Sequence, residues 1–158
     1  MPKRQPPPKS NGKPDPLQAF AASAMPQCLC MNMRLATRRL VALYEARLEA
    51  SGLNISQFGI MASAAAEPDM TMTRLAQRLE LSPSTLTRTL RPLEDLKLIE
   101  TFADEKNRRV RRVKLTLEGR KTLKRAGAAW AEAQAEAVEI VPPKLVDALM
   151  GATAKLPV

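Results

Sequence analysis

The chain has 158 residues, of which 25 are lysine or arginine and 16 are aspartate or glutamate, so its formal net charge is +9. This length is enough for one domain with a hydrophobic core. Excess positive charge favours polyanions, because neutralising phosphates releases their counterions. Aromatic residues make up only 3% of the chain, whereas sequence-specific binders of single strands rely on stacking rings. The composition therefore favours duplex DNA as the partner.

Catalysis has little support, because the sequence contains no histidine, the commonest general base and metal ligand. The only cysteines, Cys28 and Cys30, lack the second pair that a structural zinc site needs. No apolar run reaches the length of a membrane span, and the N-terminal segment lacks the apolar core of a signal peptide. We therefore expect neither an enzyme nor a bound metal, cofactor or membrane.

The first sixteen residues form a basic, proline-rich segment in which six prolines alternate with Lys3, Arg4, Lys9 and Lys13. Such a segment cannot bury enough apolar area to fold. We expect residues 1–16 to be a disordered arm, followed by a domain over 17–158. The arm either adds sequence-independent affinity for DNA or has no function of its own.

A long helix is predicted over about 25–50, where apolar residues recur every three or four positions from Leu29 to Leu43. A second apolar ridge runs through Val41, Tyr44 and Leu48. Two ridges need two partners, one in the same domain and one plausibly in another chain. An alanine-rich helix over 117–138 and a last helix starting at Pro142-Pro143 offer matching surfaces.

The centre of the chain predicts two short helices joined by a tight turn. Residues 71–79 form an amphipathic helix with Leu75, Ala76 and Leu79 inward, and 80–82 form the turn. Ser82 then acts as N-cap of a second helix and Pro83 fits its first position. Its inward face carries Leu86, Leu90 and Leu93, which leaves Ser84, Thr85, Arg88 and Arg91 pointing outward. Such groups can contact base edges and phosphates in a major groove.

Pro92 lies inside this second helix, where it cannot donate to the carbonyl group of Arg88. It either bends the helix near Arg88 or marks where the base-contacting part ends. We favour the second interpretation, because base contacts in such motifs come from the N-terminal half of the helix.

A basic hairpin is predicted next, with strands over 98–102 and 110–115 and an extended tip over 103–109. Alternation places Val113 and Leu115 on the packed face and Arg112 and Lys114 on the wet face. The cations suit DNA, although lysines and arginines on an edge strand also discourage aggregation between sheets.

In this order the segments resemble the MarR family of winged helix-turn-helix transcription regulators, over roughly residues 28–134. The most specific motifs are L-S-x-S-T-L-T-R-x-L at 81–90, L-E-x-L-x-L-I at 93–99 and L-T-x-x-G at 115–119. The resemblance implies a mainly α (α+β) fold, with a winged helix-turn-helix over about 55–116 between dimerisation helices over about 25–50 and 117–154. It also implies a homodimer in the bacterial cytoplasm that binds a pseudo-palindromic operator in double-stranded DNA.

By the same resemblance, the second helix of the motif is the recognition helix and a wing arginine enters the adjacent minor groove. This arginine falls on Arg109, whereas Asn107 replaces the aspartate of the family's usual Asp-x-Arg motif, which weakens a charge-assisted contact. The candidate DNA contacts are Ser82, Ser84, Thr85, Thr87, Arg88, Arg91, Lys106, Arg108, Arg109 and Arg111.

The resemblance further implies a small anionic or aromatic effector, such as a carboxylate or a CoA thioester. Arg34, Arg38 and Arg39 are then candidate contacts and Met61 is an apolar wall, although each could equally be a surface charge or a core methionine. The leading hypothesis is a homodimeric repressor that such a ligand releases from DNA.

Two alternatives remain. A non-specific architectural DNA-binding protein needs only the charge and the basic arm. A thiol-based redox sensor would use Cys28 and Cys30, which are otherwise small buried apolar residues; some MarR relatives switch through a cysteine near this end, and Arg34 could lower a thiol pKa if it lies close. A disulfide between residues two apart would require the helix to unwind there.

Overall fold

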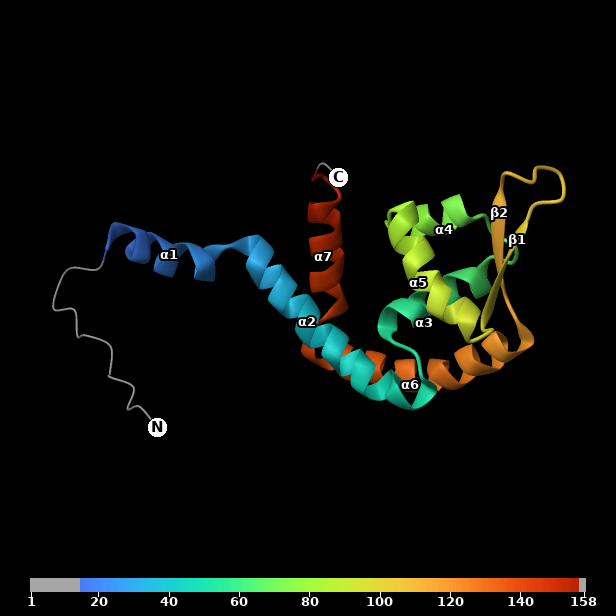
Figure 1. The fold of residues 1–158 in the computed structure, drawn as a ribbon. Coiled ribbons are helices and arrows are strands. Elements are labelled where there is room, and N and C mark those ends of the chain that lie inside the picture. Colours follow the sequence, from blue (N-terminus) through green and yellow to red (C-terminus); the bar gives the residue numbers. More distant parts are fainter. Residues whose placement is uncertain (1–14, 157–158) are drawn as a thin grey trace, which may run out of the picture. The chain divides into compact units, whose positions relative to one another are not determined.

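The computed structural model describes residues 15–156, which form helices and one two-stranded antiparallel sheet (Figure 1). The expected mainly helical winged-helix fold is confirmed. Contacts divide the chain into two compact units, Met1–Arg39 and Leu40–Val158. No helix in the described part of the chain is long and apolar enough to cross a membrane.

The first unit contains α1 (Pro16–Gln27) and the beginning of α2 (Leu29–Leu48). α1 was not predicted. It begins at Pro16, inside the segment expected to be an arm, and the rest of that segment, residues 1–14, lies outside the described residues. Proline is well suited to the first helical position, because its missing N–H would have no partner there.

The single helix predicted for 25–50 is also interrupted. Cys28 separates α1 from α2 and has an extended backbone, with φ −68° and ψ 107°. Pro26 lies in the last turn of α1, where it removes a helical hydrogen bond and weakens the turn. The side chain of Asn32 donates to the carbonyl oxygen of Pro26 at 2.9 Å, which satisfies a group that the break leaves open.

The second unit contains the remaining elements, and their order matches the predicted winged helix and the helices that follow it. A short 3₁₀ turn (Glu49–Ser51) follows α2. The other elements are α3 (Ile55–Ala66), α4 (Met72–Arg78), α5 (Pro83–Asp95), β1 (Ile99–Ala103), β2 (Arg111–Leu115), α6 (Leu117–Ile140) and α7 (Pro143–Thr153).

Side-chain caps begin four of these helices. Asn54 and Gln57 form a reciprocal capping box at α3, while Thr71, Ser82 and Thr116 accept backbone N–H groups at α4, α5 and α6. Each such cap contributes about 1 kcal/mol, because it satisfies a donor that has no partner within the helix. The predicted cap at Ser82 is confirmed.

The core of the second unit lies between α3, α5, the end of α2 and the packed face of the hairpin. Its largest fully buried side chains are Leu48, Ile60, Met61, Leu75, Leu86, Leu90, Leu93 and Val113. The three leucines expected to face inward from α5 are among them. Each buried leucine contributes roughly 1.5–3 kcal/mol relative to exposure. α6 joins this core through Ala126 and through Trp130, whose ring stacks on Phe58 at 5.8 Å between centroids.

The hairpin pairs Ile99 with Leu115 and Ala103 with Arg111, one residue later than expected at the start of each strand. The predicted alternation is confirmed for Val113 and Leu115, which are buried. A third segment joins the sheet edge, because the N–H of Val113 donates to the carbonyl oxygen of Met70 at 3.0 Å. This contact ties the hairpin to the loop that precedes α4.

The L-T-x-x-G motif forms the joint between hairpin and α6. The Thr116 hydroxyl accepts from the N–H of Gly119 at 3.0 Å and donates to the carbonyl oxygen of Lys97 at 2.7 Å. Gly119 itself packs against the backbone of Leu98, leaving no room for a side chain. The motif thereby fixes the base of the hairpin against the first turn of α6.

Candidate nucleic-acid interface

The N-terminus of α5 carries a cluster of hydroxyl groups. Ser82 caps the helix by accepting from the N–H of Thr85 at 3.2 Å. Its Oγ also lies 3.0 Å from Oγ of Ser84 and 2.8 Å from Oγ1 of Thr85. The positive end of a helix dipole, together with ordered hydroxyls, favours an anion such as a DNA phosphate.

Thr87 lies one turn further along α5 and is exposed. Its hydroxyl donates to the carbonyl oxygen of Pro83 at 2.9 Å, so the donor is already used. The oxygen lone pairs and the methyl group remain for a base edge, where a threonine methyl can contact the methyl of thymine.

Arg88 and Arg91 complete the outward face of α5. Both are exposed, and neither side chain forms a hydrogen bond or ion pair with another residue in the described range 15–156. α5 continues through Pro92 to Asp95, so the proline does not end the helix. The helix therefore presents two uncommitted guanidinium groups beside its hydroxyl cluster.

Nested side-chain caps shape the tip of the hairpin. Oδ1 of Asp104 accepts from the N–H groups of Lys106 and Asn107, both at 2.9 Å. Asn107 in turn accepts from the N–H of Arg109 at 3.1 Å through Oδ1. The amide that replaces the expected aspartate thus contacts the backbone of Arg109.

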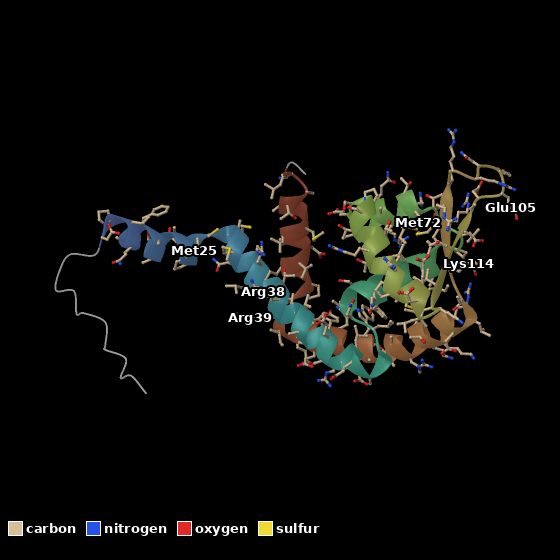
Figure 2. All side chains as sticks on the ribbon, in the orientation of Figure 1. Met25, Arg38, Arg39, Met72, Glu105 and Lys114 are labelled. Atoms are coloured by element: carbon tan, nitrogen blue, oxygen red, sulfur yellow. The ribbon has the colours of Figure 1, made fainter. Side chains whose placement is uncertain are left out.

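The side chains of Lys106, Arg108 and Arg109 are exposed at this tip and form no ion pair with other described residues. Glu105 extends from the same turn (Figure 2). Arg111 is already engaged, because its Nη2 donates to the carbonyl oxygen and Oγ1 of Thr101 at 3.1 and 3.0 Å. The hydroxyl of Thr101 donates to Glu94 on α5 at 2.6 Å, which links the hairpin to α5.

Arg112 lies on the face of β2 opposite to the buried Val113, as the alternation predicts, but its charge is paired. Its side chain is 34% exposed, and its Nε donates to Oδ2 of Asp104 at 2.5 Å. Its Nη1 donates to the carbonyl oxygen of Asp69 at 2.6 Å. The Arg112 guanidinium is the main group that lowers the pKa of Asp104, followed by the N–H of Asn107 and, to a smaller extent, the N–H of Lys106. Burial of the carboxyl group opposes them by raising its pKa.

Sequence reasoning missed Asp104, Thr101 and Asp69, although a weak signal existed for the first of them. An aspartate at the start of a polar turn commonly accepts backbone N–H groups two or three residues later. The contact of Arg112 with the loop before α4 had no such signal, because those segments are 43 residues apart in sequence.

The candidate effector residues fall into two groups. Arg34, Arg38 and Arg39 are exposed on α2 in the first unit, and Figure 2 labels the latter two. Met61 is fully buried in the core of the second unit. Met61 is therefore a core methionine in this structure, with no surface for a ligand to contact.

The second unit contains two apolar cavities of comparable size. One, of about 310 Å³, lies between the end of α2, α6 and α7 and includes Tyr44, whose hydroxyl donates to Gln134 at 2.6 Å. The other, of about 330 Å³, lies between α4, α5 and the hairpin, with Thr87 and Arg111 in its walls. Neither is lined by the candidate effector residues Arg34, Arg38, Arg39 and Met61.

Cys28 is half-buried and Cys30 is exposed, and both are free thiols. Among the described residues no group of histidine, cysteine, aspartate and glutamate side chains is arranged to hold a metal ion.

A capped helix-turn-helix followed by a basic hairpin defines a winged helix-turn-helix DNA-binding protein. The MarR family model matches residues 53–110. MosR, a transcriptional regulator of M. tuberculosis, is 32% identical, with 82% of this chain and 96% of that chain covered and a TM-score of 0.70. Its structure in complex with DNA matches at 30% identity, with 82% and 100% coverage and a TM-score of 0.72.

The chain thus belongs to the MarR family and is a DNA-binding transcription regulator. The repressor CouR, bound to a 23-mer DNA duplex, shares the fold at 23% identity, with 84% of this chain and 94% of that chain covered and a TM-score of 0.72. A comparison with curated proteins gives no match.

Proposed function

We propose that the chain is a homodimeric repressor of the bacterial cytoplasm that binds a pseudo-palindromic operator. The observation that carries the proposal is the outward face of α5, where Arg88 and Arg91 are exposed and form no hydrogen bond or ion pair with other described residues. Ser82, Ser84 and Thr85 would bind phosphate at the helix N-terminus, and Thr87 and Arg88 would contact bases. Arg109 would enter the neighbouring minor groove, with Lys106 and Arg108 near the backbone.

Dimerisation is supported by apolar side chains that the second unit leaves exposed. They lie at the end of α6, along α7 and just after it, and comprise Val138, Ile140, Leu145, Val146, Leu149, Met150 and Leu156. Many exposed apolar side chains within one short stretch of chain are typical of an interface between chains. A homodimer would place two copies of α5 about one DNA turn apart, which accounts for a palindromic site. Sedimentation analysis should therefore give a dimer at micromolar concentration.

Replacement of the candidate contacts tests the DNA-binding mode. An operator is first selected from random DNA by binding to the full chain, and affinity is then measured by fluorescence anisotropy at several salt concentrations. Arg88→Ala should weaken specific binding by about 1–3 kcal/mol, and Arg109→Ala should lower both affinity and the salt slope, the latter by about one. Arg120→Ala is the matched control, because Arg120 is an exposed arginine near the start of α6. It follows the base of the hairpin and not its tip. Unchanged affinity in both test variants would refute the assignment.

A competition assay separates this function from that of a non-specific architectural protein. Random DNA in excess should displace the protein far less effectively than the selected operator does, because specific binding exceeds non-specific binding by about three orders of magnitude or more. Equal displacement by both competitors would favour the architectural alternative.

Release by a small anionic or aromatic ligand is the second part of the proposal. It is supported by the structure of CouR from Rhodococcus jostii RHA1 bound to p-coumaroyl-CoA, a relative that shares the fold at 19% identity. Arg34, Arg38 and Arg39 remain the candidate anion contacts, since guanidinium groups bind carboxylates and phosphates bidentately. Aromatic carboxylates and their CoA thioesters, titrated into the DNA complex, should dissociate it, and replacement of these arginines by glutamine should abolish that response.

A thiol switch is a second candidate, because α1 and α2 are interrupted at Cys28. A disulfide between Cys28 and Cys30 would therefore not have to unwind a continuous helix. A hydroperoxide would oxidise one thiolate to a sulfenic acid and would itself be reduced to the alcohol. The second thiol would then attack the sulfenic acid sulfur, which forms the disulfide and releases water. If Cys28→Ser combined with Cys30→Ser leaves the peroxide sensitivity of DNA binding unchanged, this candidate is eliminated.

A further inference from the structure

The tip of the hairpin is organised around one carboxylate. The side chain of Asp104 is only 14% exposed although its neighbours at the tip, Glu105 and Lys106, are exposed. Both of its oxygens are engaged, Oδ1 by the N–H groups of Lys106 and Asn107 and Oδ2 by the guanidinium of Arg112. The carboxylate therefore has little capacity left to interact with a ligand, and its contacts serve the shape of the tip.

Arg112 extends this arrangement to the helix-turn-helix. Its Nη1 donates to the carbonyl oxygen of Asp69, which has a left-handed backbone with φ 56° in the loop between α3 and α4. The N–H of Val113 donates to Met70 in the same loop. Asp104, Arg112 and Asp69 thus form a continuous link from the hairpin tip to the loop that leads into α4; we call these three residues the wing clamp.

Two hydrogen bonds through Asn107 join the clamp to Arg109. Asn107 donates its N–H to Asp104 and accepts the N–H of Arg109 on Oδ1. The carbonyl oxygen of Asn107 accepts from Val110 at 2.8 Å, which closes the turn. Any loosening at Asp104 would therefore release the backbone that carries Arg109.

We propose that Asp104 and Arg112 are positioning residues for DNA binding, which hold the hairpin tip so that Arg109 meets the duplex while they touch no DNA themselves. The proposal rests on the proposed contact of Arg109 with DNA. It assigns a function to an acidic residue in a basic DNA-binding element, where a carboxylate would otherwise only repel phosphate.

The direction in which DNA affinity changes when Asp104 loses its charge separates a positioning role from long-range electrostatics. Removing a negative charge near DNA strengthens binding if only long-range attraction matters. Loss of a positioning residue weakens binding, because the ordered contact of Arg109 is lost. Glu105 supplies the matched control: it is the adjacent acidic residue, it is exposed, and it makes no ion pair or side-chain hydrogen bond with other described residues (Figure 2).

The first experiment compares Asp104→Asn with Glu105→Gln in the full chain, by anisotropy titration with the selected operator. Asp104→Asn should weaken binding by roughly five- to tenfold, the lower part of the range expected when one ordered DNA contact is lost. Glu105→Gln should leave affinity unchanged or raise it. Equal or tighter binding by Asp104→Asn would overturn the proposal. Melting temperatures are measured in parallel, and Arg112→Gln replaces Asp104→Asn if the latter does not fold.

The second experiment repeats both clamp substitutions in the Arg109→Ala background. If the clamp acts through Arg109, each should then cost much less affinity than in the wild-type chain. Arg112→Gln should also cause no further fall of the salt slope in this background, whereas a direct phosphate contact by Arg112 would lower it by about one. Additive losses, or that further fall, would overturn the positioning role while leaving the contact of Arg109 intact. If Arg109→Ala by itself has no effect, the proposed DNA contact fails and the clamp has nothing to position.

Discussion

Gly119 allows a sharp test of how the hairpin is joined to α6. It lies in the first turn of α6, and a Cβ atom built on it would be 1.9 Å from the carbonyl oxygen of Leu98 and 2.8 Å from its carbonyl carbon. Both atoms belong to the backbone, so no side-chain rotation can relieve the overlap. In Gly119→Ala the two segments must separate by about 1 Å or more to restore ordinary contact.

Two opposing effects set the size of the change. Alanine favours a helix over glycine by about 1 kcal/mol. Against this, overpacking costs about 1–3 kcal/mol, and separation stretches the hydrogen bond from the N–H of Thr116 to the carbonyl oxygen of Leu98, which is 3.1 Å long and contributes about 1 kcal/mol. We therefore expect Gly119→Ala to lower the free energy of unfolding by about 1–3 kcal/mol.

The assay is urea unfolding followed by circular dichroism, at one fixed protein concentration because a dimer is stabilised by mass action. Gly127→Ala is the matched control, since it lies in the same helix and a Cβ there meets nothing within 4 Å. The control should gain about 0.5–1 kcal/mol. A Gly119→Ala protein as stable as the control would refute the argument that backbone contact excludes a side chain there.

Three further predictions concern the same unit. Thr116→Ala should cost about 1 kcal/mol in the same assay because it removes the N-cap of α6, whereas Thr116→Ser should retain most of the stability. Trp130→Ala should cost about 3 kcal/mol because it removes the ring stacked on Phe58, and calorimetry should show a much smaller loss for Trp130→Phe. The pKa of Asp104 is lowered by folding, so its contribution is complete above its unfolded pKa and disappears as the pH falls through the folded value. The difference in melting temperature between wild type and Asp104→Asn should therefore be constant from pH 5 to 7 and shrink below about pH 4; a difference that persists at pH 2 would contradict this.

Local sequence patterns were sufficient to predict the helix-turn-helix. Leu86, Leu90 and Leu93 recur at helical spacing and are all buried, and Ser82 caps the helix that it was expected to begin. These outcomes depend on neighbours within one or two turns, so a sequence contains the information directly. The outward position of Arg88 follows from the same periodicity.

Sequence reasoning was incomplete where a second segment decides the outcome. Arg112 follows the alternation of its strand, yet its long side chain turns to Asp104 and Asp69 because both accept hydrogen bonds from its guanidinium. Met61 lies on α3 as expected, but the packing of α3 against neighbouring elements makes it a core residue. The break at Cys28 was missed for a local reason, since the apolar periodicity around it outweighed the signal from Pro26.

The sequence by itself determined the class of this protein, the order of its elements and the residues on the outer face of α5, because periodicity, capping and turn chemistry act over short distances along the chain. Only the tertiary structure decided which cations of the hairpin are free to meet DNA and which are held. That outcome depends on a hydrogen bond between β2 and a loop some 40 residues away in sequence, and no local pattern encodes such an approach.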